Sequence, residues 1–373
     1  MNSGQNPGLY IHVPFCRSKC LYCDFYSTAS RALVPSWLDA VRREAGLYRE
    51  RFPAFDSLYL GGGTPSLLDE RQLAALLEGI RRIFSFLPGS EMSMEANPDS
   101  LTVEKLKVAG ALGINRISLG VQSLDDDDLK YLGRPHSAAQ SLEAVDAIRS
   151  CGFDNLGIDL IYGLEMQSLR GWKKTLDRVL QFRPEHISCY QLTLEKGTPF
   201  WKMKAEGRVH PIGEKMAGAF FIWTSRYLER HGYVHYEISN FARGPEHACR
   251  HNLKYWSHTP YLGLGPSAHS FQAGRRWWNV KSVREYCGLL AESRPPVEDS
   301  EVLSSDQLEL ESLALGLRTR DGASLYGQGG VLRSSRVIEE LQKSGLARVR
   351  NGRIQPTRKG FLVADSLPLM FCR

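Results

Sequence analysis

Short runs prone to form strands alternate with amphipathic segments along the first half of the chain. The runs are typical of buried strands, and the segments between them carry apolar residues at helical spacing. Strands are predicted at residues 9–13, 57–60, 91–95, 116–119, 156–161 and 186–190. Helices are predicted at residues 36–50, 69–84, 102–112, 137–151 and 168–181. This alternation predicts an α/β fold with a parallel sheet and outer helices, and hence a partial or complete TIM-like barrel.

The alternation stops near residue 195, which predicts a barrel over residues 1–195. Residues 196–295 are rich in Gly, His and aromatic residues and form a predicted extension that ends in a linker at Pro295-Pro296. Residues 296–373 are predicted to form a C-terminal winged-helix-like α+β domain. Its predicted helices and strands are 305–317, 334–344, 346–349 and 353–355, with the last two on either side of Asn351-Gly352, a type I′ hairpin signal.

The overall composition is that of a globular protein. The chain has 373 residues, of which 42% are hydrophobic and 24% charged. Its polar start and the lack of any run of about 18 apolar residues predict a cytoplasmic protein that is not integral to a membrane. The net charge of +6 is modest, so no nucleic-acid partner is expected, although winged-helix-like domains often bind DNA.

Cys16, Cys20 and Cys23 follow the first predicted strand with the spacing C-x3-C-x2-C. Three thiolates on one loop can bind three irons of a [4Fe–4S] cluster and leave the fourth iron open to an exchangeable ligand. A structural zinc site usually has four Cys or His ligands in paired motifs, and no second pair is evident. The spacing therefore favours an iron–sulfur cluster over zinc.

The run Gly61-Gly62-Gly63-Thr64-Pro65 follows the second predicted strand. Glycines allow a ligand to approach the backbone closely and leave N–H and C=O groups exposed to it. An α-amino acid suits the open iron because it can chelate through its amine and its carboxylate. A glycine-rich turn opposite the cysteine loop could hold that amine.

The cysteine loop and the glycine turn together resemble the radical S-adenosylmethionine (SAM) superfamily. Residues 10–26 and the motifs at 94–98, 118–122, 133–136 and 159–163 resemble the oxygen-independent coproporphyrinogen III oxidase family within it. This resemblance implies a partial (βα)6 barrel that binds a [4Fe–4S] cluster and SAM. The SAM contacts that it implies are Tyr10, Tyr22, Gly62, Gly63, Thr64, Glu95, Gln122, Arg134 and Asp159. The chemistry agrees, because carboxylates suit the amine and hydroxyls of SAM and a guanidinium suits its carboxylate.

The sequence departs from the oxidase group beside the cysteine loop. The oxidases resemble C-x3-C-x2-C-x-C, whereas Phe25 stands at the fourth cysteine position here. The chain also has only nine residues before Tyr10, without the N-terminal extension of the oxidases. Both departures resemble a sister group, the HemW-type haem chaperones. The expected function is therefore to bind haem and transfer it to acceptor proteins, and the alternative is a radical SAM oxidase of coproporphyrinogen III or a related tetrapyrrole.

A segment rich in histidine lies far downstream. Five of the ten histidines fall within 35 residues, and the run from His251 to Trp256 resembles the HNxxYW motif of the HemW group. Haem iron takes His or thiolate ligands, and aromatic side chains suit the porphyrin plane. His251 is the predicted haem ligand and Cys249 the second candidate, unless these residues only form hydrogen bonds in a folded extension. The sequence names no haem acceptor and does not decide whether the chain forms a homodimer.

Overall fold

The computed structural model describes residues 6–327, 330 and 332–372. Six parallel strands lie side by side in chain order at the centre of one sheet. They are β1 (Gly8–Val13), β2 (Ala54–Gly62), β3 (Ser85–Ala96), β4 (Arg116–Gln122), β5 (Leu156–Tyr162) and β6 (His186–Gln191). All six predicted strands are thus confirmed, and so is the α/β fold.

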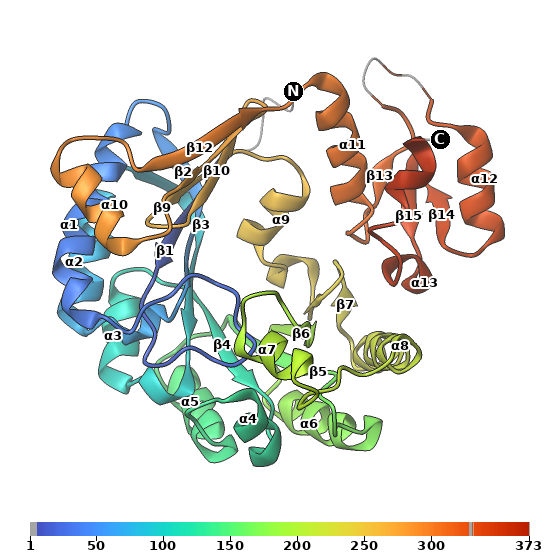
Figure 1. Ribbon diagram of the computed structural model, residues 1–373, viewed down its shortest axis with the longest axis horizontal. Coiled ribbons are helices and arrows are strands. Elements are labelled where there is room, and N and C mark those ends of the chain that lie inside the picture. The colour runs from blue at the N-terminus through green and yellow to red at the C-terminus, as the bar shows by residue number, and fades with distance from the viewer. Residues whose placement is uncertain (1–5, 328–329, 331, 373) are drawn as a thin grey trace.

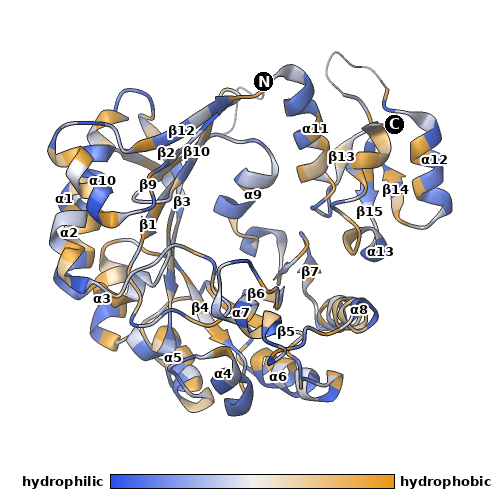
Figure 2. Ribbon diagram, in the orientation of Figure 1, coloured by the Kyte–Doolittle hydropathy of each residue, from blue (hydrophilic) through white to orange (hydrophobic). Residues whose placement is uncertain are grey.

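Helices cover the outer face of this sheet (Figure 1). They are α1 (Val34–Leu47), α2 (Glu70–Arg81), α3 (Val103–Ala111), α4 (Asp126–Leu132), α5 (Ala138–Ser150) and α6 (Leu169–Gln181). Asp69 and Ser137 begin α2 and α5 with reciprocal caps, in which a side chain accepts from a backbone N–H of the first turn and a glutamine returns the bond. In Figure 2 these helices carry both apolar and polar residues, as helices with one buried face do.

The sheet continues beyond β1 and β6, so the segment predicted as an extension flanks the barrel strands on both sides. The added strands are β9 (Tyr261–Leu264), β10 (His269–Gln272), β11 (Arg275–Asn279) and β12 (Val297–Val302) beside β1, and β8 (Asn240–Ala242) and β7 (Val234–His235) beside β6. Only β9 is parallel to its barrel neighbour. The sheet therefore stays open, with β12 at one edge and β7 at the other.

The linker predicted at Pro295-Pro296 is wrong. The carbonyl of Pro296 accepts a hydrogen bond from the N–H of Val280, and β12 begins at the next residue. Helices of this segment were not predicted either. They are α7 (Pro199–Ala205), α8 (Glu214–Arg230), α9 (Arg250–Trp256) and α10 (Val283–Ala291).

The C-terminal residues form a small three-stranded sheet with helices and a hydrophobic core of its own. Its elements are α11 (Ser305–Gly316), β13 (Ala323–Ser324), α12 (Ser335–Lys343), β14 (Ala347–Arg350), β15 (Arg353–Pro356) and α13 (Arg358–Phe361). Asn351 and Gly352 join β14 to β15 with φ angles of 50° and 70°, as a type I′ hairpin requires. The predicted hairpin is therefore confirmed.

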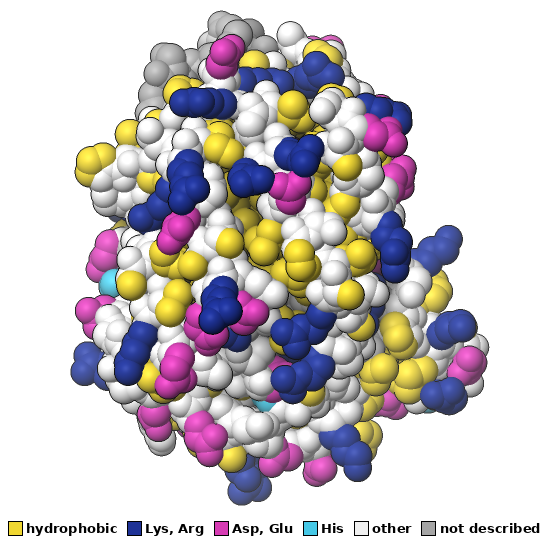
Figure 3. All heavy atoms as spheres, turned by 90° about the vertical axis from the view of Figure 1, so that its left-hand side faces the viewer, with side chains coloured by type: hydrophobic (Ala, Val, Ile, Leu, Met, Phe, Trp, Pro, Cys, Tyr) yellow, Lys and Arg dark blue, Asp and Glu magenta, His cyan; other side chains and the backbone are white. Residues whose placement is uncertain are grey.

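Charges of both signs are interspersed over the face formed by the outer helices on the left of Figure 1, as Figure 3 shows. This mixture agrees with the modest net charge of the chain. Within the residues that the structure describes, no helix has both the length and the apolar character needed to cross a membrane.

Candidate functional site

A cavity of about 1100 Å³ opens at the carboxyl ends of the parallel strands. Every residue predicted to bind the cluster or SAM lines it. These residues are Tyr10, Cys16, Cys20, Tyr22, Cys23, Gly62, Gly63, Thr64, Glu95, Gln122, Arg134 and Asp159. The carboxyl ends of parallel strands are where such sheets place their binding sites, which explains why residues so far apart in sequence meet here.

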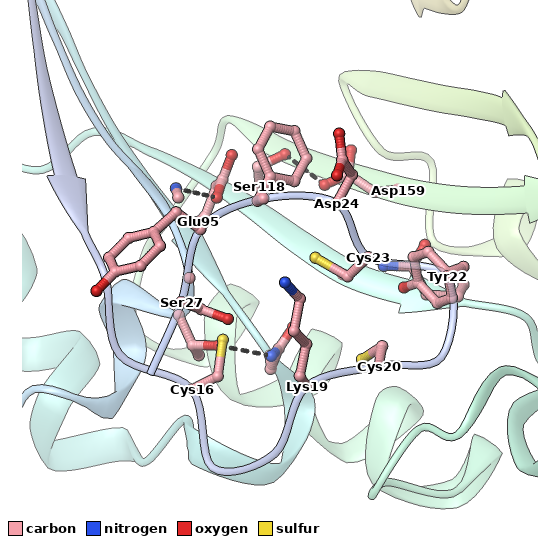
Figure 4. A pocket seen from close by; sticks show the side chains of 18 of the residues that line it. Cys16, Lys19, Cys20, Tyr22, Cys23, Asp24, Ser27, Glu95, Ser118 and Asp159 are labelled. Atoms are coloured by element: carbon pink, nitrogen blue, oxygen red, sulfur yellow. Dashed lines mark hydrogen bonds between the residues drawn. The ribbon is translucent and has the colours of Figure 1, made fainter. Parts of the chain in front are cut away.

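The three cysteines are spaced around the inside of the loop that follows β1 (Figure 4). Two backbone hydrogen bonds tie the ends of this loop together: Cys16 N–H donates to Thr28 O at 3.0 Å, and Thr28 N–H donates to Pro14 O at 2.7 Å. Arg134 Nη1 donates to Cys20 Sγ at 3.3 Å, and Thr64 Oγ1 lies 3.6 Å from Cys16 Sγ. A guanidinium donor at a cysteine sulfur suits a thiolate, the form in which cysteine binds iron.

Among the described residues, no three His, Cys, Asp or Glu side chains are placed to hold a single metal ion. A [4Fe–4S] cluster does not require three ligands around a single metal ion, because each thiolate binds a separate iron. Three half-buried cysteines around one loop, two of them with a polar side chain at the sulfur, fit that cluster.

The glycine turn packs directly against the cysteine loop. Gly63 N–H donates to Val13 O and Thr64 N–H donates to Phe15 O, both at 2.8 Å. Gly62 has a φ of 109°, and a Cβ there would lie 2.5 Å from the ring of His12. Glycine is therefore needed in this turn partly so that its backbone can lie close to β1 and the cysteine loop. Its N–H groups are largely used within the protein, so less backbone is free for a ligand than the sequence suggested.

Two carboxylates, Glu95 on β3 and Asp159 on β5, line the cavity wall. Glu95 accepts hydrogen bonds from Tyr59 Oη at 2.9 Å and from Gly62 N–H at 3.2 Å. Burial, together with the charge of Asp159, raises the pKa of Glu95 to about 7. Asp159 accepts from Ser118 and Ser188, and burial raises its pKa as well. A cationic ligand group beside this pair would favour the charged carboxylates.

Arg134 and Gln122 leave polar atoms without partners in the same wall. Arg134 Nη2 donates to Asn97 Oδ1 at 2.7 Å and to Gly120 O at 3.1 Å, but its Nε is buried and unpaired. Gln122 has a positive φ of 63°, and its Oε1 is also buried and unpaired. Buried polar atoms are rarely left unpaired, and the donor and acceptor here fit a polar ligand such as SAM.

Several residues of the site were not predicted from the sequence. Asn97 joins Thr64 to Arg134, because its Nδ2 donates to Thr64 Oγ1 at 3.1 Å while its Oδ1 accepts from Arg134. His12 accepts from Tyr10 Oη at 3.1 Å and donates through Nε2 to Tyr26 O at 2.9 Å. Burial lowers the pKa of His12 to about 4, so this imidazole is neutral. The two-residue spacing of Tyr10 and His12 on one strand was the available signal, because it places both on one face.

The two predicted haem ligands do not line the cavity. His251 is fully buried, with Nδ1 3.0 Å from Ser57 Oγ and Nε2 2.9 Å from Tyr255 Oη, and burial lowers its pKa to about 3. Cys249 is also buried, 3.6 Å from Glu91 Oε1, and burial raises the pKa of its thiol. The motif reaches the cavity through Tyr255 instead.

Comparison with known proteins gives matches over most of the chain. The radical SAM superfamily model matches residues 10–179. Heme chaperone HemW of Bacillus subtilis is 36% identical, covering 96% of this chain and 97% of its own. Heme chaperone HemW of Mycobacterium tuberculosis H37Rv is also 36% identical, covering 98% and 94%. The structure of coproporphyrinogen III oxidase (HemN) from Escherichia coli superposes with a TM-score of 0.83 at 24% identity, covering 98% of this chain and 90% of that one, and so has the same fold.

Proposed function

Because the chain belongs to the HemW heme chaperone family of the radical SAM superfamily, we propose that it binds haem and transfers it to haem-accepting proteins. The observation that carries the proposal is the 36% identity to heme chaperones over nearly the whole chain. Phe25 adds a physical reason. Its side chain is 67% exposed and lines the cavity, and an exposed aromatic ring at a cavity suits an apolar, planar ligand.

The protein's resident cofactors in this proposal are a [4Fe–4S] cluster and SAM. Cys16, Cys20 and Cys23 would hold three irons of the cluster, and its open iron could be chelated by the amine and carboxylate of SAM. Arg134 donates to Cys20 Sγ through Nη1 and offers its Nε to the ligand. Glu95 and Asp159 supply acceptors for amine and hydroxyl groups.

The remaining predicted contacts line the wall around these groups. They are Tyr10, Tyr22, Gly62, Gly63, Thr64 and Gln122. Haem is held reversibly in the same cavity, since a carrier must release it. Haem-accepting proteins are the partners, and a second copy of the chain is a further candidate.

A second candidate function is a radical SAM oxidase that acts on coproporphyrinogen III or a related tetrapyrrole. The complete set of polar side chains at the proposed SAM site favours it, because a carrier has no evident need of them. Phe25 at the fourth cysteine position argues against it.

One paired experiment distinguishes the two functions. The cluster is reconstituted without oxygen, and haem is added while the Soret absorbance is recorded. In parallel, the same preparation receives reductant, SAM and coproporphyrinogen, and protoporphyrinogen and 5′-deoxyadenosine are measured. We expect a saturable haem spectrum and no protoporphyrinogen. Turnover to protoporphyrinogen would support the oxidase, and a lack of any haem-dependent spectrum would refute the chaperone.

A further inference from the structure

The ten histidines differ sharply in what their ring nitrogens contact. Only two of them, His12 and His269, line the cavity. Both nitrogens of His12 are hydrogen-bonded, to Tyr10 Oη and to Tyr26 O. Within the described part of the chain, no hydrogen bond or ion pair reaches either ring nitrogen of His269, and its side chain is exposed. An imidazole must have a free nitrogen lone pair to bind a metal, and of the two histidines that line the cavity only His269 has a ring nitrogen without a partner among the described residues.

We propose that His269 binds the haem iron in this cavity, with Lys281 beside it to pair with a haem propionate; this inference rests on the proposed haem-chaperone function. His269 begins β10, directly opposite Trp278 on β11. The two rings are stacked, with centroids 5.7 Å apart. A ligand on a strand at the cavity wall, with its ring held by an aromatic neighbour, has a restricted orientation.

The surroundings of His269 suit a porphyrin. Tyr255 and Tyr261 line the same cavity, with ring centroids 4.7 Å apart in an edge-to-face arrangement. Together with Phe25 they supply aromatic surface for the macrocycle. Lys281 is exposed at the cavity, and no ion pair within the described residues occupies it. A free ammonium can form charge-assisted hydrogen bonds with a carboxylate.

The charge state of His269 agrees with a role as ligand. Although His269 is exposed to the cavity, partial desolvation of its ring, together with the nearby positive charges of Arg276 and Lys281, lowers the pKa of its imidazole. The ring is therefore neutral near pH 7 and can bind iron without first losing a proton. When His269 replaces another ligand on the haem iron, one bond to iron forms as another breaks, so the step needs no oxidant or reductant.

The test compares ferric haem bound to cluster-reconstituted wild type, His269→Ala and His269→Cys. The matched control is His210→Ala, an exposed histidine outside the cavity that bonds to Glu165. Soret spectra are corrected for the haem-free protein, and electron paramagnetic resonance reports the axial ligand of ferric haem. Cluster absorbance and far-ultraviolet circular dichroism check that each variant is folded.

We expect the imidazole signature in wild type and His210→Ala, its loss in His269→Ala, and a thiolate signature in His269→Cys. Haem affinity should fall by roughly tenfold or more in His269→Ala, and added imidazole should restore the signature. Lys281→Gln should weaken binding without changing the ligand signature. An unchanged spectrum in His269→Ala would overturn the inference and leave the haem chaperone function standing. A wild-type protein that binds no haem would overturn both.

Discussion

At the scale of single residues, the cavity wall combines unpaired polar atoms with carboxyl groups of raised pKa, an arrangement that suits a polar ligand. Unpaired atoms of Arg134 and Gln122 lie near two carboxylates whose pKa values are raised by burial. Unpaired buried groups destabilise the folded chain, typically by about 1–3 kcal/mol each. A polar ligand that satisfies them should therefore stabilise the protein as well as bind to it.

The first prediction concerns the cluster. Cys20→Ser should abolish the brown absorbance of the reconstituted protein, because serine is a poor ligand for iron–sulfur clusters and the donor from Arg134 loses its thiolate. Visible absorbance and iron analysis measure this. The control is Cys151→Ser, a half-buried cysteine that does not line the cavity. An unchanged spectrum, with zinc found by metal analysis, would contradict the cluster itself.

The second prediction concerns Glu95, whose pKa in the folded protein is about 7 against an ordinary value of 4.5. A carboxyl whose pKa is raised by folding begins to destabilise the folded state when the pH exceeds its pKa in the unfolded chain. The effect is complete when the pH exceeds its pKa in the folded protein. Glu95→Gln removes this effect. The free energy of unfolding of the variant, relative to wild type, should therefore rise between pH 4.5 and 7 by on the order of 2–3 kcal/mol.

Chemical denaturation of cofactor-free protein across this pH range measures the effect. Lost hydrogen bonds shift the difference equally at every pH, so only its slope tests the prediction. Glu78→Gln, at an exposed helix position, is the control. A difference that stays flat from pH 4.5 to 7 would show that Glu95 does not titrate as proposed.

The residue scale also shows what sequence could and could not predict. The residues predicted to bind the cluster and SAM belong to short local motifs, and the structure brings all of them to one cavity. The high density of histidines, together with the HNxxYW motif, is what predicted His251 as the haem ligand. Density does not reveal which imidazole keeps a free nitrogen, because Ser57 and Tyr255 reach His251 only in the folded protein.

At the scale of elements, α9 packs against β2 next to the cavity. His251 on this helix bonds to Ser57 on β2 and stacks on Tyr59, with ring centroids 5.4 Å apart. Lys254, one turn further on, pairs with Asp56 at 2.6 Å. These contacts fix the helix that carries Tyr255 into the cavity wall.

The third prediction follows from this packing. His251→Ala should lower the free energy of unfolding by about 2–4 kcal/mol, because it leaves a cavity and two unpaired hydroxyl partners. It should not change the axial-ligand signature of bound haem. Denaturation curves and haem spectra measure the two effects, with His210→Ala as the exposed control. A stable variant that lost the signature would instead assign the iron to His251.

The elements that sequence did not predict share a physical cause. Strands β1 to β6 alternate with periodic helices, so local pattern identifies them. In contrast, β9 pairs with β1 although some 250 residues separate them, and β10 and β11 are only four and five residues long. Their stability comes from neighbours distant in sequence, which no local pattern records.

At the scale of the whole molecule, the C-terminal domain is joined to the barrel by polar contacts around α9 and α11. Glu311 on α11 accepts from Arg276 on β11 at 2.9 Å and lies 3.2 Å from His258 Nε2. The guanidinium of Arg318 lies over the ring of Trp256, 5.4 Å from its centroid. With its own hydrophobic core, this domain is expected to move as a unit when such contacts break.

The fourth prediction tests this junction. Glu311→Gln should speed amide hydrogen exchange in α11 while leaving α2 unchanged, because it weakens two contacts between the sheet side and the domain. Half-buried pairs of this kind contribute about 1 kcal/mol, so a several-fold change in exchange is expected. Glu339→Gln, at an exposed pair within α12, is the control. Equal exchange in both variants would show that the junction does not depend on Glu311.

The open sheet has a consequence for self-association. Its outer strand β12 has unpaired backbone groups along one side, the arrangement through which sheets of two copies can join and aggregate. Glu298, Asp299 and Glu301 are exposed along that strand. If two copies paired through β12, these acidic side chains would lie close together and their like charges would repel. The opposite edge strand, β7, is only two residues long. These features oppose pairing through the free edges of the sheet, so we expect a homodimer of this protein to form through another surface.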